Sequence, residues 1–75
     1  MNPKDKATQL FNKYYVSILE IDHDLSEEII ISILAKKQSL IAVDEIISIV
    51  EWYDIRHISN QLKFWIEVKN EIEKL

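Results

Sequence analysis

The first part of the chain has an amphipathic pattern that predicts a helix over residues 3–21. Its apolar positions recur every three or four residues, as one face of an α-helix requires. They are Ala7, Leu10, Phe11, Tyr14, Tyr15, Ile18 and Leu19. Asn2 is a favourable N-cap, and Pro3 suits the first helical position. We expect the helix to end near Ile21, because the side chains of Asp22-His23-Asp24 compete for backbone hydrogen bonds.

A long second helix is predicted over residues 27–53. Ser26 fits as its N-cap, and Glu27 and Glu28 stand in the first turn, where the helix dipole favours negative charge. A heptad seam follows, with one polar member. The seam consists of Ile29, Ile33, Lys36, Leu40, Val43, Ile47 and Val50, and a second apolar row beside it consists of Ile30, Leu34 and Ile41. Ile31, Ile49 and Ile55 fall outside both rows, so we expect them to form exposed contact surface.

The last part of the chain predicts a third helix over residues 60–74, with Ser59 or Asn60 as its cap. Its expected inner face consists of Leu62, Trp65, Val68, Ile72 and Leu75. Short turns separate the three helices. The pattern therefore predicts an all-α, three-helix arrangement with a long central helix, in one domain that spans residues 1–75.

Composition narrows the classes of function. The chain has 75 residues, 48% of them apolar, and it has no cysteine and no glycine. A domain this small cannot hide so much apolar surface, so we expect some of it to meet another protein. The lack of glycine excludes Gly-rich nucleotide loops. A net charge of −4, with Arg56 as the one arginine, argues against direct binding of nucleic acid. With no membrane span and no signal peptide recognised, we expect a cytoplasmic protein.

Two groups of residues have side chains of the types that bind metals or catalyse reactions. Asp22-His23-Asp24 contains metal-ligand types, but contiguous ligands strain a metal site, and we interpret the triplet as a helix-breaking acidic loop. His57 beside Arg56 could form a nuclease-like corner, but the positioned acid and base that such cleavage needs are not recognised. The sequence therefore predicts no enzyme, no metal and no cofactor.

Two further groups are candidate partner-binding residues. Glu20, Asp22, Asp24, Glu27 and Glu28 place five negative charges within nine residues. They form either a solvated loop with favourable first-turn charges, or a patch that imitates nucleic-acid phosphates and occupies a basic groove. Trp52, Tyr53 and Arg56 form either an ordinary connector around a packed Trp52, or an aromatic anchor at an interface.

Three blocks of the sequence suggest an origin: Ser26-Glu27-Glu28, the block LIAVDEII at 40–47 and the ending FWIEVKNEIEKL at 64–75. Together they resemble small helical proteins from phages and prophages of the Bacteroidota, over about residues 26–75. The resemblance implies an accessory or host-takeover protein, similar in class to anti-defence inhibitors such as anti-CRISPR proteins. It carries over no functional residue.

These observations favour a non-enzymatic binding protein that obstructs a host macromolecule, with an anti-CRISPR-like inhibitor of an RNA-guided nuclease as the leading hypothesis. A structural homo-oligomeric helical module is the alternative. A multimeric sponge for a signalling nucleotide is a third hypothesis, which the scarcity of arginine disfavours.

Overall fold

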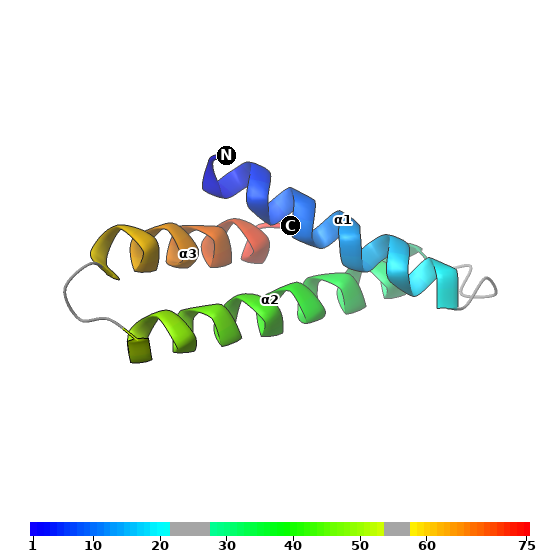
Figure 1. Ribbon diagram of the computed structural model, residues 1–75. Coiled ribbons are helices and arrows are strands. Elements are labelled where there is room, and N and C mark those ends of the chain that lie inside the picture. The colour runs from blue at the N-terminus through cyan, green and yellow to red at the C-terminus, as the bar shows by residue number, and fades with distance from the viewer. Residues whose placement is uncertain (22–27, 54–57) are drawn as a thin grey trace.

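The computed structural model describes residues 1–21, 28–53 and 58–75. Within those ranges the chain forms three α-helices and no strand, namely α1 (Pro3–Ile21), α2 (Glu28–Tyr53) and α3 (Ile58–Glu73) (Figure 1). The all-α arrangement with a long central helix is confirmed, and each boundary lies within two residues of its predicted position. Because α3 begins at Ile58, Ser59 and Asn60 lie inside its first turn, and their prediction as the cap is wrong.

The start of α1 follows the predicted capping geometry. Asn2 Oδ1 accepts a hydrogen bond from the backbone N–H of Asp5 at 2.8 Å. The Asn2 carbonyl accepts the first helical bond, from the N–H of Lys6 at 3.1 Å. The cap thus satisfies N–H groups that the first turn of a helix leaves free. The apolar face predicted for α1 is also confirmed, since all its members are buried or half-buried.

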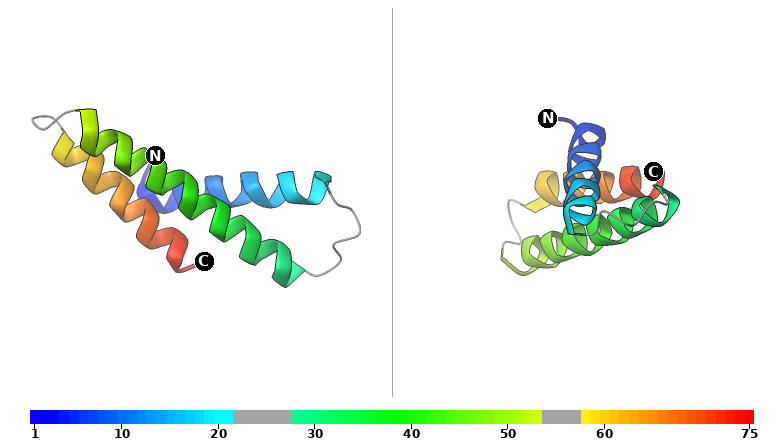
Figure 2. Two further views of the ribbon diagram at one scale, coloured as in Figure 1. Left: turned by 90° about the horizontal axis from the view of Figure 1, so that it is seen from below. Right: turned by 90° about the vertical axis from the view of Figure 1, so that its right-hand side faces the viewer.

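The helices form an elongated molecule. α2 and α3 lie side by side and antiparallel, and α1 lies obliquely across them (Figure 2). The principal extents are 48 × 19 × 16 Å, and the radius of gyration is 13.9 Å. A compact domain of 75 residues would have a radius of gyration of about 11 Å. The chain therefore exposes more surface than its length requires.

The core lies where all three helices meet. Ala7 of α1, Val43 of α2, and Val68 and Ile72 of α3 are at most 1% exposed and form one cluster. Half-buried side chains surround it; they are Leu10, Leu40, Ile47, Phe64 and Trp65. The rings of Phe64 and Trp65 meet edge to face, with centroids 5.3 Å apart. Leu75 was predicted to join this face, but it follows the end of α3 and is 54% exposed.

The buried stripe of α2 differs from the predicted heptad seam. Ile31, Ala35, Ser39 and Val43, spaced by four residues, are all buried. Ile31 is 1% exposed, so its prediction as contact surface is wrong, whereas Ile33 of the predicted seam is 61% exposed. The small Ala35 and Ser39 allow a neighbouring helix to approach closely, which favours this side. The Ser39 hydroxyl donates to the Ala35 carbonyl at 2.7 Å, so the buried polar group is satisfied.

Two lysines attach α3 to α2. Lys36 Nζ donates to the carbonyl oxygen of Glu73 at 2.8 Å, which places a positive charge at the end of α3 where carbonyl groups lack helical partners. Lys69 Nζ lies 2.9 Å from Asp44 Oδ1. The hydrogen bond with the Asp44 carboxylate, and its negative charge, raise the pKa of Lys69 above the ordinary value.

Candidate binding surface

The side of α2 that faces away from α1 and α3 is largely apolar. We call it the outer face, and it consists of Ile30, Ile33, Leu34, Lys37, Ile41, Glu45, Ser48 and Trp52, all of them exposed. The exposed fraction is 41% for Ile30, 49% for Ile41 and 83% for Trp52. Isolated apolar residues on a surface are ordinary, but several on one helix face indicate a contact surface.

Helical periodicity explains why these residues share a side. At 3.6 residues per turn, Ile30, Leu34 and Ile41 fall within about 40° of one another around the α2 axis. The buried Ser39 lies on roughly the opposite side of the axis from Ile41, whereas the buried Ile31 lies about a quarter of a turn away. The predicted second apolar row is thus the centre of the outer face. The sequence indicates such a face, because α2 has apolar residues on all its sides. It does not indicate which apolar row points toward the other helices.

Along the line through Ile30, Ile41 and Trp52, the charges of the outer face are few and symmetrically placed. The exposed Asp44 and Glu51 lie at its edge, on the same side of α2 as Ile33. Lys37 stands four residues before Ile41, and Glu45 stands four residues after it. Both side chains are exposed. The face therefore has an apolar centre between one positive and one negative position.

The predicted acidic patch is represented by two described residues. Glu20, near the end of α1, and Glu28, at the start of α2, are both exposed. The other three predicted members, Asp22, Asp24 and Glu27, lie outside the described residues. The functional interpretation of this patch stays a prediction.

Of the three residues in the predicted aromatic corner, the structure describes the side chain of Trp52. This side chain is 83% exposed, so the interpretation of a connector around a packed Trp52 is wrong. Tyr53 ends α2, with its side chain outside the described part, and Arg56, His57 and Ile55 also lie outside it. Trp52 and Glu28 stand at opposite ends of α2, about 36 Å apart at 1.5 Å per residue. One copy of the chain therefore does not bring Trp52 close to Glu28.

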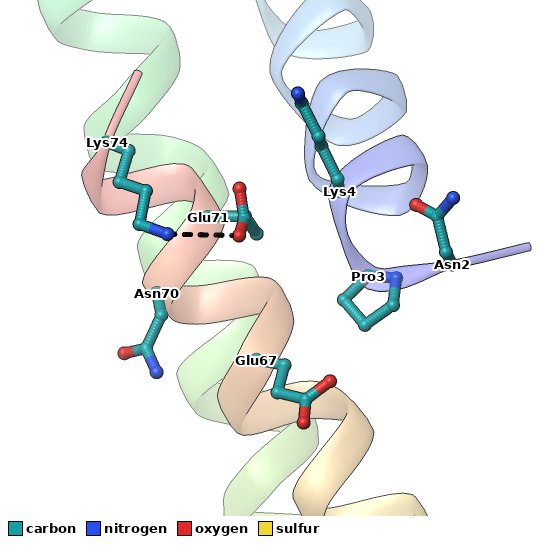
Figure 3. A pocket seen from close by; sticks show the side chains of 7 residues that line it. All are labelled: Asn2, Pro3, Lys4, Glu67, Asn70, Glu71 and Lys74. Carbon is teal, nitrogen blue, oxygen red and sulfur yellow. Dashed lines mark hydrogen bonds and ion pairs between the residues drawn. The ribbon is translucent and has the colours of Figure 1, made fainter.

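A shallow cleft of about 430 Å³ lies between the start of α1 and the second half of α3 (Figure 3). Its lining consists of Asn2, Pro3 and Lys4 at the start of α1, and Glu67, Asn70, Glu71 and Lys74 toward and just beyond the end of α3. Asn2 is engaged as the α1 cap, and Lys74 pairs with Glu71 at 3.2 Å. Because Asn2, Glu71 and Lys74 already serve the helices and the lining carries both signs of charge, the cleft is a helix junction without a dominant ligand chemistry.

Among the described residues, no group of three or more histidine and acidic side chains is arranged to hold a metal ion. The Asp22-His23-Asp24 triplet lies outside those residues. No helix in the described ranges is long and apolar enough to cross a membrane.

In the described part of the chain, the outer face of α2 is thus exposed and takes no part in the packing of the three helices. Comparisons give no guide to its partner, because no protein-family model, no curated protein and no solved structure matches this chain.

Proposed function

We propose that this chain is a non-enzymatic protein-binding module whose contact surface is the outer face of α2. The observation that carries the proposal is the row of exposed isoleucines on a helix that is apolar on all sides. Ile30, Ile33 and Ile41 are 41%, 61% and 49% exposed, respectively. A helix of this composition is normally buried all round. Here α1 and α3 cover one side, and a partner is needed for the other.

The polar contacts support the same proposal. Lys36 serves the end of α3, and Lys69 pairs with Asp44 between two helices. Those side chains hold the bundle together and are accounted for by structure. In the described part of the chain, the apolar outer face has no such role within one copy. Burial of apolar area is the main favourable term in protein association.

Obstruction of a host nucleic-acid-handling enzyme, such as an RNA-guided nuclease, is a second candidate function. The exposed indole of Trp52 favours it, because tryptophan is enriched among the residues that dominate interface energies. The exposed Glu20 and Glu28, and the resemblance to phage proteins, agree with it. Reversal of Glu20 and Glu28 to lysine should slow binding of a nuclease target in low salt, since charge complementarity mainly accelerates association. An unchanged association rate would contradict this candidate.

The proposed function is tested by making the outer face polar. The double variant Ile33→Ser/Ile41→Ser should keep its helical circular dichroism and lose association with every protein partner, the chain itself included. The matched control is Val16→Ser/Ile66→Ser, because Val16 and Ile66 are 51% and 42% exposed on α1 and α3. Association is measured by affinity capture from the native host and by sedimentation. A double variant that associates like the wild type would refute the proposal.

A further inference from the structure

The outer face of α2 is complementary to itself. We propose that it is occupied by a second copy of this chain, with the two α2 helices antiparallel and crossing at Ile41. The inference rests on the proposed function, because it assigns a partner to the same face. It follows from the order of charges along the face, from the apolar positions around Ile41, and from the surface that the single chain leaves exposed.

The order of charges distinguishes antiparallel from parallel pairing. In a two-fold symmetric parallel pair each residue faces its own copy, so Lys37 would stand opposite Lys37, and Glu45 opposite Glu45. In an antiparallel pair centred on Ile41, residues equally far before and after Ile41 come to the same level. Lys37 of each copy then reaches the level of Glu45 of the other. Opposite charges meet in this arrangement, and like charges meet in the other.

Apolar positions agree with the same centre. Ile41 lies on the two-fold axis and meets its own copy. Seven residues away on either side, Leu34 comes to the level of the small Ser48, so a large side chain faces a small one. Eleven residues away, Ile30 comes to the level of Trp52, whose indole is 83% exposed in the single chain. All five positions are exposed and available to a partner.

The exposed area of the single chain is large enough for such an interface. Its accessible surface is 5715 Å², whereas a folded monomer of 8.9 kDa exposes about 4800 Å². The surplus of about 900 Å² is close to the roughly 800 Å² that each partner buries in a stable protein interface. The surplus belongs to the whole elongated chain, and a dimer with an interface of ordinary size would bring the exposed area of each copy near the value for a compact protein.

The pairing has a consequence for the predicted acidic and aromatic groups. In one chain Trp52 and Glu28 stand at opposite ends of α2. In the antiparallel pair, Trp52 of one copy lies at the level of Ile30 of the second copy, within one helical turn of its Glu28. The dimer therefore brings Trp52 of one copy to the same end of the α2 pair as Glu28 of the other, although Glu28 points away from the outer face at about 100° per residue.

Self-association is tested by sedimentation from micromolar to millimolar concentration. The wild type should form dimers. Ile41→Ser should raise the dissociation constant at least about tenfold, because Ile41 of each copy contacts Ile41 of the other and the substitution removes both side chains from the interface. Ile66→Ser is the matched control, with the same change at a similarly exposed site of α3, and it should leave the constant within about twofold. Lys37→Glu should also weaken the dimer, and the added change Glu45→Lys should restore it.

Cross-linking tests whether the two α2 helices are antiparallel. The chain has no native cysteine, so each introduced cysteine is the one thiol that can react. With a short bismaleimide, Ile41→Cys should cross-link to itself. Ser48→Cys should not, because its two copies would be about 21 Å apart. A mixture of Leu34→Cys and Ser48→Cys should give the mixed product. Self-linking of Ser48→Cys, without the mixed product, would overturn the antiparallel arrangement.

The outcomes separate this inference from the proposed function. A wild type that stays monomeric at millimolar concentration overturns the self-pairing. If captured proteins are then lost in Ile41→Ser but not in Ile66→Ser, the outer face still binds a different partner and the proposed function stands. If neither dimerisation nor capture responds to Ile41→Ser, both are refuted.

Discussion

Replacement of Ile72 by alanine tests the three-helix core. Ile72 is fully buried beside Ala7, Val43 and Val68. The change removes three carbon atoms, worth about 2.4 kcal/mol at roughly 0.8 kcal/mol each. A cavity of about 75 Å³, only partly filled by relaxation, adds up to about 1.8 kcal/mol at ~24 cal/mol per Å³. We therefore expect the free energy of unfolding to fall by about 2.5–4 kcal/mol.

The expected loss is a large part of the total free energy of unfolding. A chain of 75 residues has a free energy of unfolding of about 4–11 kcal/mol. The midpoint of thermal unfolding should fall by at least about 10 °C, since about 1 kcal/mol shifts it by 4–8 °C in a domain of this size. The assay is urea and thermal unfolding followed by circular dichroism at 222 nm. One protein concentration must be kept throughout, because self-association also stabilises the fold.

Ile66→Ala is the matched control on the same helix. Ile66 is 42% exposed, so a little over half of the transfer term is lost and no closed cavity forms. The expected loss is about 1.4 kcal/mol, and any gain in helix propensity is common to both variants. Equal losses for Ile72→Ala and Ile66→Ala, within about 0.5 kcal/mol, would refute the placement of the core.

Three further variants test the polar contacts. Asn2→Ala removes the α1 cap and should cost about 0.5–2 kcal/mol in urea unfolding, whereas Asn12→Ala, exposed in mid-helix, should cost less. Lys36→Met removes the bond to the end of α3 and should cost about 0.5–1.5 kcal/mol; an equal loss for the exposed Lys63→Met would contradict this role. Lys69 has a raised pKa, so its ion pair stabilises the fold at neutral pH and is lost as pH rises above about 10.5 through the higher folded value. The thermal midpoint of the wild type should therefore approach that of Lys69→Met between about pH 10 and 12, and a constant difference would contradict the ion pair.

The faces of α1 and α3 could be predicted because their polar and apolar positions are segregated. Each helix has one apolar stripe, such as the one through Ala7 and Leu10, and periodicity alone assigns it to the core. The end of α3 was predicted less well. Leu75 continues the spacing of the inner face, but the helix ends at Glu73, so the side chain does not follow the stripe.

The inward face of α2 could not be predicted from periodicity. Ile31 and Ile33 are chemically identical, yet one is 1% and the other 61% exposed. Ile31 is followed on its own side of α2 by the small, buried Ala35 and Ser39, whereas Ile33 is followed at the same spacing by the exposed Lys37 and Ile41. A search for small residues at four-residue spacing would have favoured this side.

The candidate surface was predicted in part. The row of Ile30, Leu34 and Ile41 was recognised as apolar, and its exposure comes from the packing of α1 and α3 on the other side of α2. The exposure of Trp52 depends on where the helices end, which no local pattern indicates. The acidic patch stays a prediction, because most of its members lie outside the described residues.

The three helices meet only around the middle of α2 in the described part of the chain, at Val43, Ala7 and Ile72. Toward Glu28 the neighbour of α2 is α1, and toward Tyr53 it is α3 (Figure 1). Each end of α2 can therefore open with the loss of one neighbour, while exposure of the middle requires the whole chain to unfold. Amide hydrogen exchange should accordingly be slowest near Val43 and faster toward both ends. The central cluster, and not helix length, then makes three helices behave as one cooperative unit.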